Sequence, residues 1–362
     1  MAGCAGYHYV WIRTRPPPLK FIVRSLLILL LVALLLAAAA GYGLHRWAHR
    51  SIAAEPAASS VEVTISPGAS VRSIGAHLKA GGVPVDPLLL TLLARLENRA
   101  TRLKAGTYAI APTTTPEQLL DRMESGDVVR IQLVVPEGWT FAQMRALIAG
   151  RADIKQTART MSDAELLAAI GAQQASPEGL FFPDTYTFTR DTTDLDLYRR
   201  AYRAQQKRLA DAWAARAPDL PFATPYEALT LASIVEKETG RAEDRPQIAA
   251  VFVNRLKRGM LLQTDPTVIY GMGARFDGNL RRADLLSDTA YNTYTRPGLP
   301  PTPIALVGAA ALTAVLNPPA TDALYFVARG DGTSEFSGKL SDHNRAVDRY
   351  QRGAAPRPAR PP

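Results

Sequence analysis

A long uncharged stretch near the N-terminus constrains the fold of this chain more than any other feature. No residue from Ser25 to Leu44 is charged, and the centre of the stretch is an almost unbroken run of aliphatic side chains. A helix of this length rises about 30 Å, which matches the thickness of a bilayer core. A cleaved signal peptide is the alternative, but its apolar part spans only about 7–15 residues. We therefore predict an uncleaved transmembrane helix over residues 25–44.

The charges that flank this stretch predict its direction. Four Lys or Arg residues precede the stretch and two follow it, and basic residues are enriched on the cytoplasmic side of a span. Residues 1–24 are therefore expected in the cytoplasm, and everything after the span is expected in the outside compartment. The chain has a single cysteine, Cys4, and this number excludes an intramolecular disulfide and a cysteine-rich metal site. Cys4 falls in the segment that we expect in the reducing cytoplasm.

The net charge of +9 does not indicate a nucleic-acid-binding surface, because the charge is concentrated at the ends of the chain. Residues 1–50 carry six basic residues and no acidic one, and residues 345–362 carry five arginines and one aspartate. The remainder has a net charge of −1, so we expect no nucleic-acid partner. His45 and His49 have helical spacing but no third ligand nearby, so we predict no metal site.

Two folded regions are predicted beyond a linker at residues 45–60. In residues 61–130 the hydrophobic pattern and the turn residues predict the order strand, helix, helix, strand, helix. Residues 131–350 combine short strands with clear helices, and residues 351–362 form a proline-rich tail that is expected to be disordered. The predicted fold class is therefore α+β, with an N-terminal transmembrane helix, a small α+β subdomain and a larger α+β domain.

Two glutamates in a predicted helix at about residues 225–239 are the candidate acids. On a helical wheel, Glu236 and Glu238 both border the apolar face of this helix. An acid held against apolar surface has a raised pKa and can act as a general acid near neutral pH. The alternative is a structural carboxylate paired with Arg241 or Arg245, and the wheel alone does not choose between the two glutamates.

Polar, aromatic and turn-forming residues gather in three later stretches, of which the third is Gly298-Leu-Pro-Pro301, and we predict them to be loops around a cleft. Gln263, Asp265 and Tyr270 lie in the first stretch, and Asn292 and Tyr294 lie in the second. Amides and carboxylates bind sugar hydroxyls, and tyrosine rings stack on sugar faces. A proline- and glycine-rich connection with no ligand would have a similar composition, so the pattern alone leaves both interpretations open.

Nine ordered motifs make the chain resemble the endolytic murein transglycosylase family, also called the YceG-like family. The resemblance covers roughly residues 60–350. Its motifs are Leu103-Lys-Ala-Gly-Thr-Tyr108, Val135-Pro-Glu-Gly138, Pro177-Glu-Gly-Leu-Phe-Phe-Pro-Asp-Thr-Tyr186, Ala232-Ser-Ile-Val-Glu-Lys-Glu-Thr239, Val251-Phe-Val-Asn-Arg-Leu256, Gln263-Thr-Asp-Pro-Thr-Val-Ile-Tyr-Gly271, Tyr291-Asn-Thr-Tyr294, Gly298-Leu-Pro-Pro301 and Asp342-His-Asn344.

The resemblance implies a single-pass inner-membrane enzyme whose catalytic domain, residues 131–350, is periplasmic. Such an enzyme cleaves peptidoglycan glycan strands internally, leaves 1,6-anhydromuramyl ends and terminates nascent strands, with no cofactor and no metal. It implies that residues 61–130 form a LysM-like subdomain and that a peptidoglycan synthase is a candidate partner. It assigns the general acid to Glu236 and a supporting role to Glu238. With Glu238, we expect Gln263, Asp265, Tyr270, Asn292 and Tyr294 to bind substrate.

This chain departs from the family pattern at two positions. Thr302 follows Pro301 where the family usually has glycine, and Ser334 stands where the family usually has histidine. If that histidine takes part in catalysis elsewhere, another group fills its role here or the role is dispensable.

Two other function classes stay open on the sequence. One is a glycan hydrolase that uses Asp265 as its second carboxylate, because hydrolysis normally needs two carboxylates. The other is a non-catalytic peptidoglycan-binding membrane anchor in which Glu236 is structural. The chemical nature of the new chain end distinguishes these classes from a transglycosylase.

Overall fold

The computed structural model describes residues 19–52 and 59–352, and the chain divides between Val129 and Arg130 into two compact units. The division lies next to the boundary expected at 130/131. Most of the expected cytoplasmic segment, the centre of the expected linker and nearly all of the expected tail lie outside the described residues.

Helix α1 (Leu19–Ala48) contains the apolar stretch, and its part from Val23 to Ala48 is long and apolar enough to cross a membrane. The helix continues past the end expected at Leu44, so residues 45–48 are helical rather than part of a linker. The reason is packing, because Leu44, Trp47 and Ala48 contact the core of the first unit. The chain then remains attached to this unit, since the N–H of Ile52 donates to the carbonyl of Thr114 at 2.9 Å.

The first unit confirms the predicted order of elements. It contains β1 (Val61–Ile65), α2 (Val71–Ala80), α3 (Pro87–Leu96), β2 (Gly106–Ile110) and α4 (Pro116–Ser125), and the two strands pair antiparallel. Local sequence determines where the helices start: Asp86 accepts hydrogen bonds from two N–H groups at the start of α3, and Thr115 forms a capping box at the start of α4. Both helices and α2 bury apolar side chains beneath the sheet, including Leu78, Leu90 and Leu119.

The second unit has two separate two-stranded antiparallel sheets among helices. The first sheet is β3 (Ile131–Val134) with β4 (Thr185–Phe188), and the second is β5 (Tyr325–Ala328) with β6 (Ser334–Ser337). The helices are α5 (Phe141–Ala149), α6 (Asp163–Ile170), α7 (Asp194–Ala214), α8 (Pro225–Glu238), α9 (Arg245–Lys257), α10 (Asp265–Met272), α11 (Arg282–Leu286), α12 (Ala309–Leu316) and α13 (Leu340–Val347), with short turns η1 (Gly273–Arg275) and η2 (Asp348–Arg352). With α1, these elements confirm the α+β class.

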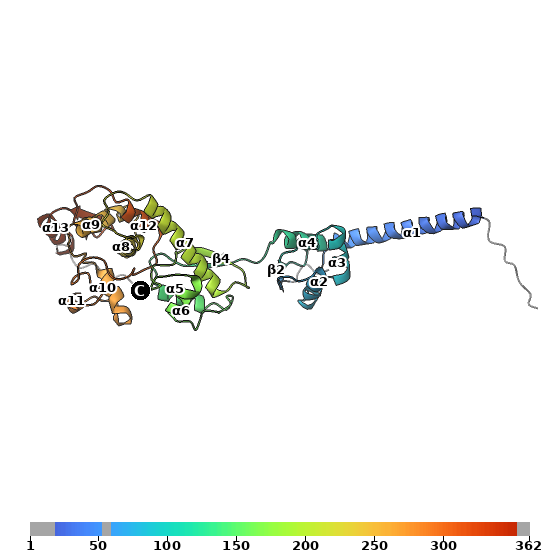
Figure 1. The fold of residues 1–362 in the computed structure, drawn as a ribbon, viewed down its shortest axis with the longest axis horizontal. Coiled ribbons are helices and arrows are strands. Elements are labelled where there is room, and N and C mark those ends of the chain that lie inside the picture. The colour runs from blue at the N-terminus through green and yellow to red at the C-terminus, as the bar shows by residue number, and fades with distance from the viewer. Residues whose placement is uncertain (1–18, 53–58, 353–362) are drawn as a thin grey trace, which may run out of the picture. The chain divides into compact units, whose positions relative to one another are not determined.

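Helix α8 is the centre of the second unit and packs against α9 and α12 (Figure 1). Two polar residues in the middle of α8 are buried with the apolar ones. Thr230 and Ser233 are buried, and each hydroxyl donates to a backbone carbonyl of the same helix. A helix buried on nearly all sides is rigid, so the side chains at its C-terminal end have a fixed position.

The stretch from Gln263 to Gly271 was expected to be a loop, and this expectation was wrong. Residues from Asp265 onward form helix α10. The residue types account for the difference: Thr264 occupies the N-cap position and Pro266 lies in the first turn, where proline's fixed φ and missing N–H favour a helix start. The predicted sugar-binding residues Asp265 and Tyr270 therefore lie on a helix, and Gln263 lies just before it.

Candidate active site

Glu236 lies in the last turn of α8 and contacts a segment that is distant in sequence. Its Oε2 atom accepts a hydrogen bond from the backbone N–H of Gly308 at 3.0 Å. Burial raises the pKa of Glu236, and this hydrogen bond opposes the rise only in part. No ion pair involves Glu236 among the described residues, and Arg241 pairs instead with Glu243 at 3.7 Å. The structure therefore does not support the salt-bridge interpretation for this carboxyl.

The loop after β3 and the segment before Gly308 lie beside the Glu236 carboxyl. The N–H of Gly138 donates to the carbonyl of Leu306 at 2.9 Å, and the N–H of Leu306 donates to the carbonyl of Trp139 at 2.6 Å. Lys237 adds a bond from its Nζ to the carbonyl of Gly138 at 3.2 Å. The segment before Gly308 is thus paired with the loop after β3, and both lie beside the end of α8.

The charged groups around Glu236 act in opposite directions. The nearby carboxylate of Glu137 raises its pKa, whereas Arg245 and Lys237 lower it. Glu137 also contacts the backbone of Gly308 so closely that a Cβ built on this glycine would overlap the carboxylate. The Nε of Arg245 is buried and has no hydrogen-bond partner in the described chain. Glu236 therefore sits between one carboxylate and two cations without forming an ion pair with either cation.

Glu238 belongs to a separate cluster. Its Oε1 accepts a hydrogen bond from the hydroxyl of Thr264, directly before α10. The next residue, Asp265, accepts a hydrogen bond from the hydroxyl of Tyr294 at 2.5 Å. Burial raises the pKa of Glu238, and the charge of Asp265 raises it further. The structure thus brings together three of the predicted substrate-binding residues, Glu238, Asp265 and Tyr294, and places Glu236 in a different cluster.

A cleft of about 920 Å³ lies between α5, the end of α8 and α10. Its wall includes Lys237, which follows Glu236 in α8, and the predicted residue Tyr270, whose ring is 4.9 Å from that of Tyr291. Glu236 is not among the residues that line the cleft, although the next residue, Lys237, is. The lining residues are Thr140, Ala142, Gln143, Glu178, Lys237, Pro266, Ile269, Tyr270, Gly273, Ala274, Phe276, Tyr291 and Ile304.

Glu178 is the site residue that sequence reasoning missed. It lines the cleft with only 5% of its surface exposed. One carboxylate oxygen accepts from the N–H of Phe141 at 2.9 Å, and the other accepts from the hydroxyl of Tyr270 at 3.0 Å. Burial raises the pKa of Glu178 to about 7. Glu178 therefore joins the start of α5 to α10. Its only sequence signal was a carboxylate within an apolar, aromatic-rich motif.

Gln263 and Asn292 have different surroundings. Gln263 is exposed, and its backbone has a positive φ of 50°. Asn292 is 0% exposed, and its amide nitrogen donates to the carbonyls of three residues between 284 and 287 while its oxygen accepts from the N–H of Tyr294 at 2.8 Å. These contacts are those of a residue that shapes the loop carrying Tyr294. Across the described ranges, no three His, Cys, Asp or Glu side chains are grouped as a metal site would require.

A family model described as the YceG-like family matches residues 63–349. The chain belongs to the YceG-like family. It is 31% identical over 309 residues to a Bacillus subtilis (strain 168) protein named endolytic murein transglycosylase, covering 81% of this chain and 85% of the relative. A protein of the same name from Streptococcus pneumoniae serotype 2 (strain D39 / NCTC 7466) is 30% identical over 322 residues, covering 79% of this chain and 58% of the relative.

Among solved structures, a yceG-like protein from Listeria monocytogenes is similar to this chain, with a TM-score of 0.50 and 31% identity. The similarity covers 80% of this chain and 99% of the Listeria chain. Sequence and fold thus agree on the YceG-like assignment and confirm the resemblance derived from the motifs.

The two departures of this YceG-like chain have different surroundings. The hydroxyl of Thr302 is 2.9 Å from the hydroxyl of Tyr291, a cleft residue, so this substitution adds a hydrogen bond at the cleft wall. Ser334 begins β6 and pairs with Ala328 of β5. The structure gives no account of how the role of a histidine at this position would be filled.

Proposed function

We propose that this protein is an endolytic murein transglycosylase, which cleaves peptidoglycan glycan strands internally. The observation that carries the proposal is the environment of Glu236, a carboxyl at the end of a buried helix that is bound to one backbone N–H and whose next residue, Lys237, lines a cleft. Because burial raises its pKa, the acid form persists to higher pH than for an exposed glutamate. The name shared by the relatives supplies the substrate class.

In this proposal Glu236 acts first as an acid and then as a base. It protonates the glycosidic oxygen as the bond from that oxygen to C1 of the muramyl sugar breaks. The resulting carboxylate accepts the proton of the C6 hydroxyl of the same sugar, and the C6 oxygen forms the new bond to C1. The products are a free hydroxyl on the leaving chain and a 1,6-anhydromuramyl end. Glu236 regains its proton, and no water is consumed.

The surroundings of Asp265 favour this reaction over hydrolysis through Asp265. Asp265 is bound by Tyr294 and acts electrostatically on Glu238. The carboxylate that raises the pKa of Glu236 is that of Glu137. A hydrolase with two carboxylates at this site would therefore use Glu137 as the second one. Chemical analysis of the new chain ends made by a Glu137→Gln variant therefore also tests this alternative.

The remaining predicted residues act in this proposal as sugar-binding groups around the acid. Tyr270, with its neighbour Tyr291, offers ring surface inside the cleft, and Gln263 and Asp265 offer exposed polar atoms. Asn292 contributes by holding the loop of Tyr294 rather than by touching a sugar. Glu238 positions Thr264 at the start of α10.

The proposal includes an inner-membrane location with a cytoplasmic N-terminus and a periplasmic catalytic unit. It further includes a LysM-like role in glycan binding for residues 61–130 and a peptidoglycan synthase as a partner. Helix α1 supports the membrane part, because four basic residues precede its apolar stretch and two follow it. Protease added to spheroplasts should degrade the body of the protein, whereas protection of the body would contradict this orientation.

Matched glutamine substitutions of the two glutamates of α8 test the assignment of the acid. We expect Glu236→Gln to lower turnover of purified glycan strands by about 10²–10⁴-fold, because an amide cannot supply the proton. Glu238→Gln should retain most activity, since its carboxyl binds within the protein. Both variants should keep the wild-type circular dichroism spectrum and unfolding temperature. Full activity in Glu236→Gln would contradict the assignment, and inactivity of the wild-type protein would favour a non-catalytic anchor.

A further inference from the structure

Helix α3 carries apolar side chains on two faces, and only one of them is covered. Leu90, Leu93 and Ala94 are buried in the core of the first unit. Leu88, Leu92 and Leu96 are 65%, 47% and 65% exposed and follow one another at intervals of four residues. This spacing places them in one stripe along the helix, which we call the leucine stripe. Contiguous exposed apolar surface on a helix marks a binding surface for a partner or a membrane.

The leucine stripe lies on the helix that meets the membrane-spanning candidate. Helices α1 and α3 are in contact within the first unit, and Figure 1 shows α3 beside the end of α1. The contact involves the very end of the apolar stretch, because Leu44 and Trp47 pack against the same core as α3. A bilayer that α1 crosses would therefore end near the part of α1 that α3 contacts.

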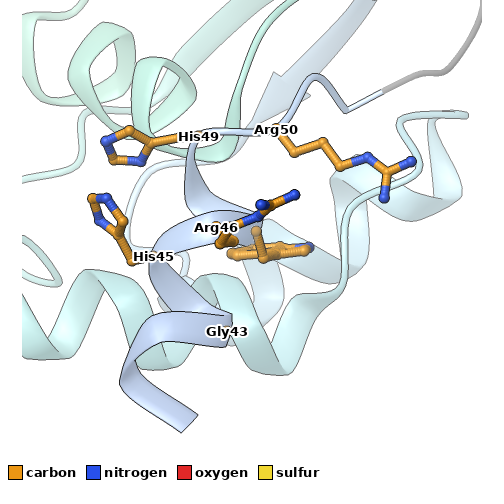
Figure 2. Close-up of a pocket in the computed structure, with 6 residues that line it drawn as sticks. Gly43, His45, Arg46, His49 and Arg50 are labelled. Carbon is orange, nitrogen blue, oxygen red and sulfur yellow. The ribbon is translucent and has the colours of Figure 1, made fainter. Parts of the chain in front are cut away.

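The end of α1 also carries basic groups suited to the lipid headgroup region (Figure 2). Arg46, in the last turn of α1, and Arg50, just after the helix, are exposed, and they line a hollow of about 630 Å³ with His45 and His49. His49 is already bound, since its Nε2 is 3.1 Å from Glu117. The two arginines are thus the cations of this cluster that face outward and can bind lipid phosphates.

We propose that the leucine stripe lies in the interfacial layer of the bilayer that α1 crosses, with Arg46 and Arg50 on lipid phosphate groups. This inference rests on the membrane location in the proposed function. Lipid is the occupant that the structure favours, because α3, which carries the stripe, contacts α1 and packs on the same core as Leu44 at the end of the apolar stretch. An amphipathic helix with leucines on one face binds such an interface. Both α1 and α3 would then attach the first unit to the membrane, rather than α1 alone.

Lipid quenching of a fluorophore on α3 tests this inference. The full chain with Cys4→Ser, labelled at Leu92→Cys with an environment-sensitive fluorophore, is reconstituted into phosphatidylethanolamine and phosphatidylglycerol vesicles that contain doxyl-labelled lipid. Leu31→Cys in α1 serves as the positive control, and Ala76→Cys, exposed on α2, serves as the matched negative control. We expect several-fold stronger quenching at position 92 than at position 76, and a loss of this difference when Leu88→Ser and Leu96→Ser are added.

Other occupants of the stripe give different results. Disulfide-linked dimers through Leu92→Cys without lipid quenching would identify a second copy of the chain and overturn the inference. Absence of both signals would mean that another part of the chain or solvent covers the stripe, which also overturns it. Arg46→Gln with Arg50→Gln should reduce quenching at position 92, and unchanged quenching would refute the role of the arginines. An unquenched label at position 31 would contradict the membrane anchor itself, so the two failures are distinguishable.

Discussion

The Oε2 atom of Glu236 lies 3.0 Å from the backbone nitrogen of Gly308, a residue 72 positions later in the chain. This contact fixes one oxygen of the carboxyl and leaves the other available to exchange a proton with a substrate. A backbone N–H is a weaker partner for a carboxylate than an arginine, so the carboxyl is oriented while its pKa stays raised by burial. A carboxyl that is oriented and keeps a raised pKa is suited to act as a general acid.

The carboxylate of Glu137 should extend the pH range in which Glu236 works as an acid. Its negative charge raises the pKa of Glu236, so the neutral Glu137→Gln variant should lower that pKa. Activity of an enzyme that needs a protonated acid declines as pH rises through the pKa of the acid. We therefore expect the alkaline limb of the pH–rate profile to move to lower pH, with activity at low pH little changed. Gly308→Ala should move the limb in the same direction, because the new methyl group displaces the Glu137 carboxylate. A limb that stays in place in both variants would contradict this account.

The buried carboxyl of Glu178 should make the second unit less stable as pH rises. Its pKa is about 7 in the folded protein against 4.5 in the unfolded chain, so the folded state binds the proton more tightly. The protonated carboxyl contributes fully below pH 4.5, and its contribution is lost as pH rises toward 7, by on the order of 3 kcal/mol. Glu178→Gln, which keeps the shape and stays neutral, should remove this dependence. Unfolding temperatures of the two proteins between pH 4.5 and 7.5 measure it, and parallel curves would contradict the prediction.

The bond between Asp265 and Tyr294 should affect substrate binding more than the chemical step. Asp265→Asn and Tyr294→Phe each remove one partner of this 2.5 Å hydrogen bond. We expect KM to rise roughly tenfold in either variant, with kcat nearly unchanged, and the double variant to cost little more than each single one. A large fall in kcat in Asp265→Asn would instead give Asp265 a part in catalysis and favour the hydrolase alternative.

The sequence predicted elements well where local signals act. Helix α8 was expected at about 225–239 and spans Pro225–Glu238, because Pro225 in the first turn and the apolar periodicity of the helix are local features. Helix α10 was missed although Pro266 is a helix-start signal, since the neighbouring glycines and polar residues also suit a turn. The end of α1 was misplaced because its last turn is stabilised by packing on the first unit.

The candidate site could be predicted by residue type but not by geometry. Glu236 and Glu238 both border the apolar face on a helical wheel, and in the structure partners from different segments distinguish them, Gly308 for Glu236 and Thr264 for Glu238. Glu178 could not be found because its partners Phe141 and Tyr270 are 37 and 92 positions away. Periodicity and capping signals depend on residues a few positions apart, so they cannot predict contacts between residues this far apart in the chain.

In the proposed reaction a single carboxyl, that of Glu236, cleaves the strand with the substrate's own C6 hydroxyl as the nucleophile. Digestion of purified glycan strands in ¹⁸O-labelled water, followed by mass spectrometry of the new ends, tests this reaction. We predict anhydromuramyl ends that lie within long strands, carry no ¹⁸O and weigh one water less than reducing ends, in the wild-type protein and in Glu137→Gln and Asp265→Asn alike. New reducing ends that carry ¹⁸O would contradict the proposed reaction and establish hydrolysis.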